Sequence, residues 1–419
     1  MASRNSRRPQ LFPKAMKILI VLEDLRTGGA QTFALRLAQA LHVAGHQVHL
    51  YDQYAHLVNQ NLVRQLAPDV PVVSYGAESP GLDAVLRKAA GLGRRLGRPD
   101  WLREDQVIRH LRQTIQRLQP DVVNSHTIKA DYVAAKAVQG LAVPLIITMH
   151  GCYELFLHKT DAPEVTPKGN FALQQAAAVV YLTAKNLEIF EQQGVRPLNK
   201  LLNRKIYNGF DGQFSADKPQ HTRSALGIPA DAKVFGMVAR GIPEKGWAHA
   251  VNSFLALEAA HPELHLVLVG ESDYLTQLRA EHPHERIHFT GFSRNPIDWV
   301  DLFDVGLLPS YFHAESLPNS IAEYLSCGKP VIASRIGEVP AMLDSEAGLA
   351  GVVLDQANWQ LTDPNQLTEA MRAYLTEPAL LAEHQQRAPL AFEKFRMKHC
   401  LAAYEDLFRQ ARAAQPQSA

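Results

Sequence analysis

The chain has 419 residues, of which 46% are hydrophobic and 20% are charged, and its formal net charge is +1. This composition excludes a disordered or fibrous protein, and the length predicts two domains because one hydrophobic core rarely serves more than about 250–300 residues. The three cysteines, Cys152, Cys327 and Cys400, stand far apart, without the spacing of a metal or redox pair. Such usage is typical of a reducing, cytoplasmic compartment.

The first residues, 1–15, predict a flexible tail. Three arginines in this tail precede the apolar run 16–22, an order also found in signal peptides. Glu23 and Asp24 follow the run at once, and no cleavage site of small residues is present, so the run predicts a buried first strand. No apolar run in the sequence approaches the length that crosses a bilayer.

Short apolar segments alternate with helical segments along the first half of the chain. A Gly-Gly turn leads into residues 32–44, where apolar side chains recur at helical spacing. Continuous apolar strands separated by helices predict a parallel sheet that is covered on both faces. The predicted strands are 16–22, 47–51, 70–75, 121–125, 144–149, 178–182 and 205–207.

The second half repeats this alternation and becomes mostly helical after Pro364, and glycines and a proline mark 208–219 as a linker. The predicted fold class is α/β, with two doubly wound, Rossmann-like parallel-sheet domains facing a cleft. We expect domains over 16–210 and 211–395, a helix over 396–411 that crosses back to the first domain, and a flexible tail over 412–419. The predicted strands are 234–238, 264–269, 287–289, 305–308, 331–333 and 352–354.

Ligands of such folds bind beyond the carboxyl ends of the strands, so the residues after strands are the candidates. Arg240 and Lys245 follow the strand 234–238, and Gly246 permits close backbone approach. A guanidinium and an ammonium on one loop suit a diphosphate. The alternative for such a basic pair is a solvated surface loop.

A second candidate loop follows the strand 305–308. Pro318 and Asn319 predict the start of a helix, whose free N–H groups can receive phosphate. Glu315 stands before this helix and Glu323 in an early turn, so both acids are expected at the mouth of the cleft. The alternative is that Glu323 complements the helix dipole and that Glu315 is solvated.

Taken together, these motifs resemble the retaining family 4 glycosyltransferases, which have the GT-B fold. The resemblance covers nearly the whole chain and is strongest between Phe235 and Glu338. Two departures concern loop geometry: Ala239-Arg240-Gly241 stands where the family commonly has Gly-Arg-Leu, and Ile336 replaces a glycine. The matching motifs are Arg240 with Lys245, Glu315-x7-Glu323, the stretch 327–334, Gly337-Glu338, Gly28-Gly29, His150-Gly151 and the stretch 208–211.

The resemblance implies a first domain that binds the acceptor and a second that binds a nucleotide-sugar donor. Arg240 and Lys245 would hold the donor diphosphate, Glu323 the ribose, and Glu315 the transferred sugar. The implied catalytic residues are Glu315, Arg240, Lys245 and His150. The implied donor-binding residues are Gly29, Arg240, Lys245, Phe292, Ser316, Leu317, Pro318, Asn319 and Glu323. His126 ends a predicted strand and Lys129 follows it, so both are candidates for acceptor contacts, with a structural role as the alternative.

The expected function is transfer of a hexose from a UDP- or GDP-sugar to a glycan or lipid-linked acceptor, in cell-surface polysaccharide or lipopolysaccharide synthesis. No Asp-x-Asp pair occurs, so no metal and no cofactor is expected. The alternatives are a sugar-nucleotide epimerase and a catalytically silent nucleotide-sugar binding protein. A nicotinamide oxidoreductase is disfavoured because Gly28-Gly29-Ala30 lacks the spacing of the dinucleotide fingerprint. No nucleic acid is expected as a partner.

The charge is distributed unevenly along the chain. Residues 1–208 hold 26 Lys and Arg against 16 Asp and Glu, whereas the remainder holds 17 against 26. Apolar residues are interleaved with basic ones between Gly81 and Arg103, which predicts peripheral docking of a cytoplasmic protein on an anionic membrane. The alternative is a solvated pair of helices. The basic residues of this stretch are Arg87, Lys88, Arg94, Arg95, Arg98 and Arg103.

Overall fold

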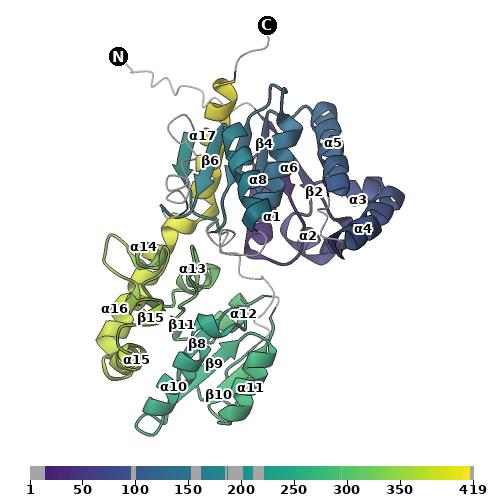
Figure 1. Cartoon of the computed structure of the whole chain (residues 1–419). Helices are drawn as coiled ribbons and strands as arrows, with labels where there is room; N and C mark the ends of the chain where they lie inside the picture. Colours follow the sequence, from purple (N-terminus) through teal and green to yellow (C-terminus); the bar gives the residue numbers. More distant parts are fainter. Residues whose placement is uncertain are drawn as a thin grey trace, which may run out of the picture.

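A computed structural model describes residues 15–95, 101–151, 162–184, 186, 202–210, 221–293, 295–313 and 315–415. Several predictions lie outside the described residues: those for the tail segments 1–14 and 416–419, for linker positions 211–219, and for Arg98. Figure 1 shows two layered bodies, with the N-terminal half of the chain above and most of the C-terminal half below.

The first domain is built on a seven-stranded, all-parallel sheet of order β3-β2-β1-β4-β5-β6-β7. Its order reverses between β1 and β4, as in other doubly wound sheets. The strands are β1 (Lys17–Leu22), β2 (Gln47–Asp52), β3 (Val72–Ser74), β4 (Val122–His126), β5 (Leu145–Thr148), β6 (Ala178–Tyr181) and β7 (Leu202–Lys205). The helices are α1 (Gly29–Val43), α2 (Gln60–Leu66), α3 (Tyr75–Glu78), α4 (Pro80–Arg95), α5 (Trp101–Leu118), α6 (Ile128–Val138) and α8 (Ala162–Gln175), with the 3-10 turn Ala55–Leu57.

The second domain carries a six-stranded parallel sheet of order β10-β9-β8-β11-β12-β13, which reverses between β8 and β11. The strands are β8 (Lys233–Val238), β9 (Leu264–Val269), β10 (Ile287–Gly291), β11 (Val305–Leu308), β12 (Val331–Ser334) and β13 (Gly351–Leu354), followed by the hairpin β14 (Gln356–Ala357) and β15 (Gln360–Leu361). The helices are α10 (Trp247–Leu257), α11 (Asp273–Glu281), α12 (Ile297–Val300), α13 (Asn319–Ser326), α14 (Val339–Leu343), α15 (Gln366–Thr376), α16 (Pro378–Phe392) and α17 (Met397–Ala413); 3-10 turns span Ser224–Leu226, Pro243–Lys245 and Glu393–Phe395.

The last helix, α17, returns to the first domain. Tyr404, Leu407 and Phe408 of α17 are buried in the same cluster as the side chains of β1 and α1. The crossing is fixed by backbone bonds: Phe210 N–H donates to Phe395 O at 2.7 Å, and Met397 N–H donates to Phe210 O at 3.0 Å. Figure 1 shows α17, in yellow, alongside the first sheet. The chain therefore crosses between the domains twice, after Phe210 and before α17, and these two crossings are bonded to each other.

The strand predictions are confirmed within one or two residues, except at the two edges of the first sheet, β3 and β7. The predicted strand 205–207 is wrong, because β7 ends at Lys205. The predicted strand 70–75 is too long, because Tyr75 begins α3. Edge strands have one neighbour only, and the side chains of β7 are half-exposed or exposed, so no apolar run marks it. The helix predicted to end at 411 continues to Ala413.

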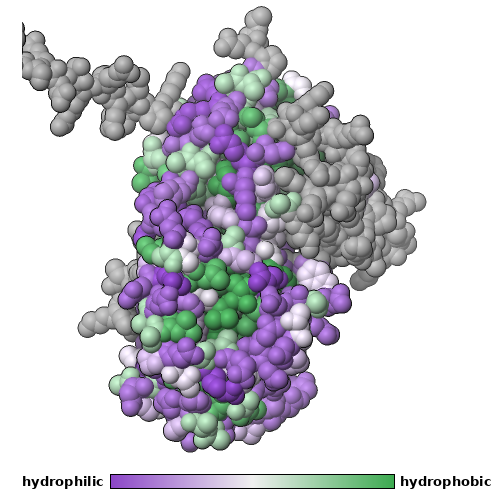
Figure 2. Space-filling model, turned by 90° about the vertical axis from the view of Figure 1, so that its left-hand side faces the viewer, coloured by the Kyte–Doolittle hydropathy of each residue, from purple (hydrophilic) through white to green (hydrophobic). Residues whose placement is uncertain are grey.

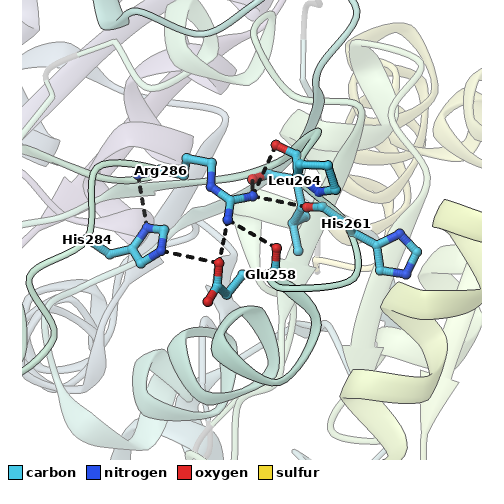
Figure 3. Close-up of polar contacts among 6 residues, drawn as sticks. Glu258, His261, Leu264, His284 and Arg286 are labelled. Carbon is cyan, nitrogen blue, oxygen red and sulfur yellow. Dashed lines mark hydrogen bonds and ion pairs between the residues drawn. The ribbon is translucent and has the colours of Figure 1, made fainter.

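Arg286 ties the start of β10 to the connection between α10 and β9. Its guanidinium donates to the carbonyl oxygens of Glu258 at 3.1 Å, His261 at 3.0 Å, Pro262 at 3.1 Å and Leu264 at 3.3 Å. It also forms an ion pair with the Glu258 carboxylate (Figure 3). Carbonyl groups at the end of a helix have no hydrogen-bond donor within the helix. The Arg286 guanidinium donates hydrogen bonds to several carbonyls of this connection and so satisfies them.

The surface is mostly hydrophilic on the face shown in Figure 2, with hydrophobic residues gathered near its centre, at the height of α14 and α16. Leu390 of α16 is 54% exposed. Among the described residues, no helix is both long enough and apolar enough to cross a membrane.

Candidate active site

The loop after β8 carries the predicted cation pair. The Trp247 indole N–H donates to Arg240 O at 3.1 Å and so fixes the start of the loop. Gly246 has a φ of +87°, and a Cβ there would lie 2.1 Å from Pro309 O. Only glycine permits this contact. The loop after β8 is thereby held directly against the loop after β11, its neighbour at the reversal of the sheet.

Lys245 and Glu315 form a buried ion pair between these two loops. Their side chains are only 8% and 9% exposed. The Ser310 hydroxyl donates to the same Glu315 carboxylate at 3.2 Å. Arg240 is exposed, and the centroid of the Phe312 ring lies 5.1 Å from the Arg240 guanidinium and 5.0 Å from the Lys245 ammonium. The structure therefore brings Arg240, Lys245 and Glu315 together, but in different environments.

Two helix N-termini face each other across the domains. α13 begins after Pro318 and α1 after Gly28, and neither helix has a side-chain cap. A Cβ at Gly29 would lie 3.5 Å from Asn319 Nδ2, so the two ends approach closely. Uncapped N–H groups and the positive ends of two helix dipoles favour an anion between them.

Glu323 lies one turn inside α13 and is partly buried. Burial raises the pKa of Glu323, and the positive charge of Arg36 on α1 opposes that rise. Because Arg36 belongs to the first domain, Glu323 faces the boundary between the domains. This placement agrees with a ribose contact.

The turn after β12 supports the Glu315 loop. Gly337 has a φ of +51°, and a Cβ there would lie 2.4 Å from Glu315 O. Glu338 N–H donates to Ser316 O at 2.8 Å. The Glu338 carboxylate accepts bonds from Lys205 Nζ at 2.6 Å and from Tyr207 OH at 2.7 Å, both in the first domain. The Glu315 loop is thus linked through one residue to the other domain.

In the first domain, His126 and His150 form a pair at the ends of β4 and β5. Their facing atoms, His126 Nδ1 and His150 Nε2, are 2.7 Å apart. His126 is fully buried, so it reaches a substrate only through the half-buried His150. Burial lowers the pKa of His150 to about 4, and burial together with its neighbour lowers the pKa of His126 well below the ordinary value. Lys129 lies apart from this pair and binds Glu23 at 3.0 Å.

The remaining residues predicted to bind the donor are of two kinds, buried and exposed. Ser316, Leu317 and Pro318 are buried, so they offer backbone groups rather than side chains. Phe292 is 61% exposed at the end of β10.

The sequence did not single out Ser310, Phe312 or Asn124 as site residues. Ser310 and Phe312 follow β11 directly, so the rule that sites lie after strands could have found them. Asn124 is polar in the middle of an apolar strand, which is the available signal for it. Among the described residues, no group of three or more His, Cys, Asp or Glu side chains could hold a metal ion.

Solved structures share this arrangement of two doubly wound domains. Anabaena Alr3699/HepE in complex with UDP aligns with a TM-score of 0.72 and 20% identity, covering 94% of this chain and 100% of that chain. Its complex with UDP-glucose gives 0.70 and 21%, with the same coverage. The apo lipopolysaccharide outer core galactosyltransferase WaaB gives 0.64 and 14%, covering 94% and 99%. The fold is therefore the GT-B fold of glycosyltransferases.

Family models match both halves of the chain: "Glycosyltransferase Family 4" over residues 27–213 and "Glycosyl transferases group 1" over 232–377. The 2-deoxystreptamine glucosyltransferase of Streptomyces kanamyceticus is 27% identical, over 67% of this chain and 74% of its own. The D-inositol 3-phosphate glycosyltransferase of Xylanimonas cellulosilytica is 28% identical, over 71% and 73%. The chain is thus a family 4-like glycosyltransferase.

Proposed function

We propose that this glycosyltransferase moves a hexose from a UDP- or GDP-sugar to a glycan or lipid-linked acceptor, with retention of configuration and without a metal. One observation carries the proposal: Arg240, the Lys245–Glu315 pair and the facing ends of α1 and α13 converge where both sheets reverse their strand order. Such reversals form the crevice in which doubly wound sheets bind nucleotides.

The charges of this crevice match the needs of sugar transfer. Cleavage of a sugar–phosphate bond leaves negative charge on the diphosphate, and fixed cations and helix N-termini stabilise it without reorganisation. Arg240, Lys245 and the N-terminus of α13 supply these groups. The Glu315 carboxylate is held by Lys245 and Ser310, so we assign it to orienting the sugar rather than to covalent attack. Front-face attack, with the departing phosphate oxygen taking the acceptor proton, agrees with this assignment.

The donor base is proposed from the comparisons. Alr3699/HepE was solved with UDP and with UDP-glucose, so a UDP-hexose is the first donor to test. The named relatives act on acceptors as different as 2-deoxystreptamine and inositol phosphate, and they do not single out one acceptor class. A role in cell-surface polysaccharide or lipopolysaccharide synthesis rests on the positive charge of the first half of the chain, which suits an anionic, lipid-linked acceptor.

The decisive experiment incubates the purified protein with UDP- and GDP-hexoses, with and without candidate acceptors, and follows products by NMR. We expect an acceptor-dependent glycoside whose anomeric coupling matches that of the donor, formed equally well in EDTA. An inverted anomer, or activity abolished by EDTA and restored by magnesium or manganese, would contradict the mechanism. A changed sugar without acceptor would favour the epimerase, and stabilisation by the donor without turnover would favour the silent binding protein.

Membrane docking is proposed through α4 and α5. Leu82, Val85 and Leu102 are 48%, 63% and 50% exposed. Arg103, which the sequence placed in the basic stretch, is buried between Asp83 and Gln53 O and does not contribute. We expect sedimentation with vesicles rich in phosphatidylserine, and weaker sedimentation after Val85→Glu. Equal sedimentation of both proteins, or none at low salt, would refute the docking surface.

A further inference from the structure

A buried chain of hydrogen bonds runs behind His150. Asn124 lies in the middle of β4 and is fully buried, which is costly for an amide unless it is bonded. Its Nδ2 atom donates to Ile146 O and to Thr148 Oγ1, both at 3.0 Å. Its Oδ1 atom lies 3.0 Å from Nε2 of His126. Every polar atom of this amide is therefore used within the first sheet.

These contacts fix the direction of every bond as far as His150. A backbone carbonyl only accepts, so the Asn124 atom facing Ile146 O is the amide nitrogen, and the oxygen faces His126. That oxygen also only accepts, so His126 carries its proton on Nε2. A neutral imidazole has one N–H, so His126 Nδ1 accepts from His150 Nε2, 2.7 Å away. The Nδ1 atom of His150 is then unprotonated.

The surroundings keep both imidazoles neutral. The ring of Phe33 on α1 lies 6.1 Å from the His126 ring and 5.5 Å from the His150 ring, centroid to centroid. Burial lowers the pKa of both histidines, and the neighbouring charge of protonated His150 lowers that of His126 further. Protonation of His150 would change Nδ1 from an acceptor into a donor. Within the described ranges, no residue forms a hydrogen bond with His150 Nδ1.

We propose that Asn124 and His126 are positioning residues that hold His150 as its Nε2–H tautomer, so that Nδ1 offers a lone pair to a hydroxyl of the donor sugar. The proposal rests on the proposed function for the identity of the ligand, but not for the tautomer. A site that only accepts selects a hydroxyl that donates. It discriminates against an analogue that lacks this hydroxyl, by about tenfold for one neutral hydrogen bond.

The tautomer can be read without any activity. Protein labelled with 15N-histidine is compared with the His150→Gln variant, and the signals that disappear are assigned to His150 in long-range 1H–15N spectra. We expect an unprotonated Nδ1 and a protonated Nε2. A proton on Nδ1 of His150 in the wild type would overturn the proposal, whatever the protein transfers. If the tautomer is as expected and no sugar is transferred, only the proposed function fails.

Asn124→Asp tests the relay itself. The carboxylate accepts but cannot donate, and it favours a doubly protonated His126 whose Nδ1–H forces His150 into the other tautomer. We expect the His150 signals to shift accordingly, and the tenfold discrimination against one deoxy analogue of the donor to disappear. Ser125→Ala is the matched control, because Ser125 is a buried neighbour on β4 whose hydroxyl has no hydrogen bond within the described residues. An Asn124→Asp variant that keeps the tautomer and the discrimination would refute the relay.

Discussion

The cation pair provides the sharpest prediction, because the structure places its two members in different environments. From the sequence, Arg240 and Lys245 are equivalent contacts to a diphosphate. In the structure, Lys245 is buried and paired with Glu315, whereas Arg240 is exposed beside Phe312. Both changes to alanine should lower the transfer rate by about a hundredfold or more, the usual effect of removing one preorganised charge-stabilising group. Their effects on stability should differ.

The difference in stability follows from what each change leaves behind. Lys245→Ala leaves the Glu315 carboxylate buried, and removing one partner of a buried pair typically costs about 3–5 kcal/mol. The Ser310 hydroxyl still donates to that carboxylate, so we take the lower end, about 3 kcal/mol. For a domain of this size, that lowers Tm by roughly 6–12 °C. Arg240→Ala loses only an exposed cation–π contact, about 0.5–1 kcal/mol.

The assay combines initial transfer rates with thermal unfolding of each variant. The control is the double variant Lys245→Met, Glu315→Gln, which removes both charges and nearly preserves the volume of the pair. Its Tm should return towards that of the wild type, because a buried pair without either charge is often neutral in stability. Its transfer rate should stay low. Equal Tm values for Lys245→Ala and Arg240→Ala would refute the buried pair, and near-normal turnover in both would refute the diphosphate contact.

Three further predictions concern other parts of the molecule. Glu323→Gln should raise the donor Kd about tenfold in calorimetry, and an unchanged Kd would contradict the ribose contact. Burial lowers the pKa of His150 to about 4, and burial together with the neighbouring His288 lowers the pKa of His265 to about 4, so the unfolded state, with a pKa of about 6.5, binds more protons between these pH values. Urea unfolding should therefore show stability falling from pH 6.5 to 4, by up to about 1.4 kcal/mol per pH unit for each histidine; a flat profile would refute this. Arg286→Met should destabilise the fold by about 2–3 kcal/mol while leaving the donor Kd unchanged, and an unaltered Tm would contradict its structural role.

The sequence could predict the fold because its central strands carry a strong and local signal. β9 and β11 are buried along their whole length, and their predicted bounds match the structure. The edge strand β7 lacks that signal, because the residues after it, Ile206 and Tyr207, are more apolar than the strand itself. Tyr207 does not continue the strand and instead contacts Glu338. That contact joins residues 131 positions apart, and no local pattern encodes it.

In the candidate site, too, the sequence predicts the residues but not the contacts between them. Arg240, Lys245 and Glu315 could be chosen from the sequence because they lie in the loops after β8 and β11 and belong to the motifs that carry the family resemblance. The sequence could not reveal that Lys245 and Glu315 satisfy each other, since burial of both depends on Gly246 bringing two loops into contact. Sequence reasoning likewise treated His126 as a separate acceptor contact.

The histidines illustrate how a strand register creates function. In the parallel register of β4 and β5, Asn124 stands opposite Ile146, and His126 stands opposite Thr148. In this register, the side-chain amide of Asn124 donates to a carbonyl on the neighbouring strand and accepts from a histidine on its own strand. A shift of the register by one residue would turn these side chains to the other face of the sheet. The tautomer of His150 is therefore determined by the pairing of β4 with β5, which the sequence around Asn124 and His126 does not encode by itself.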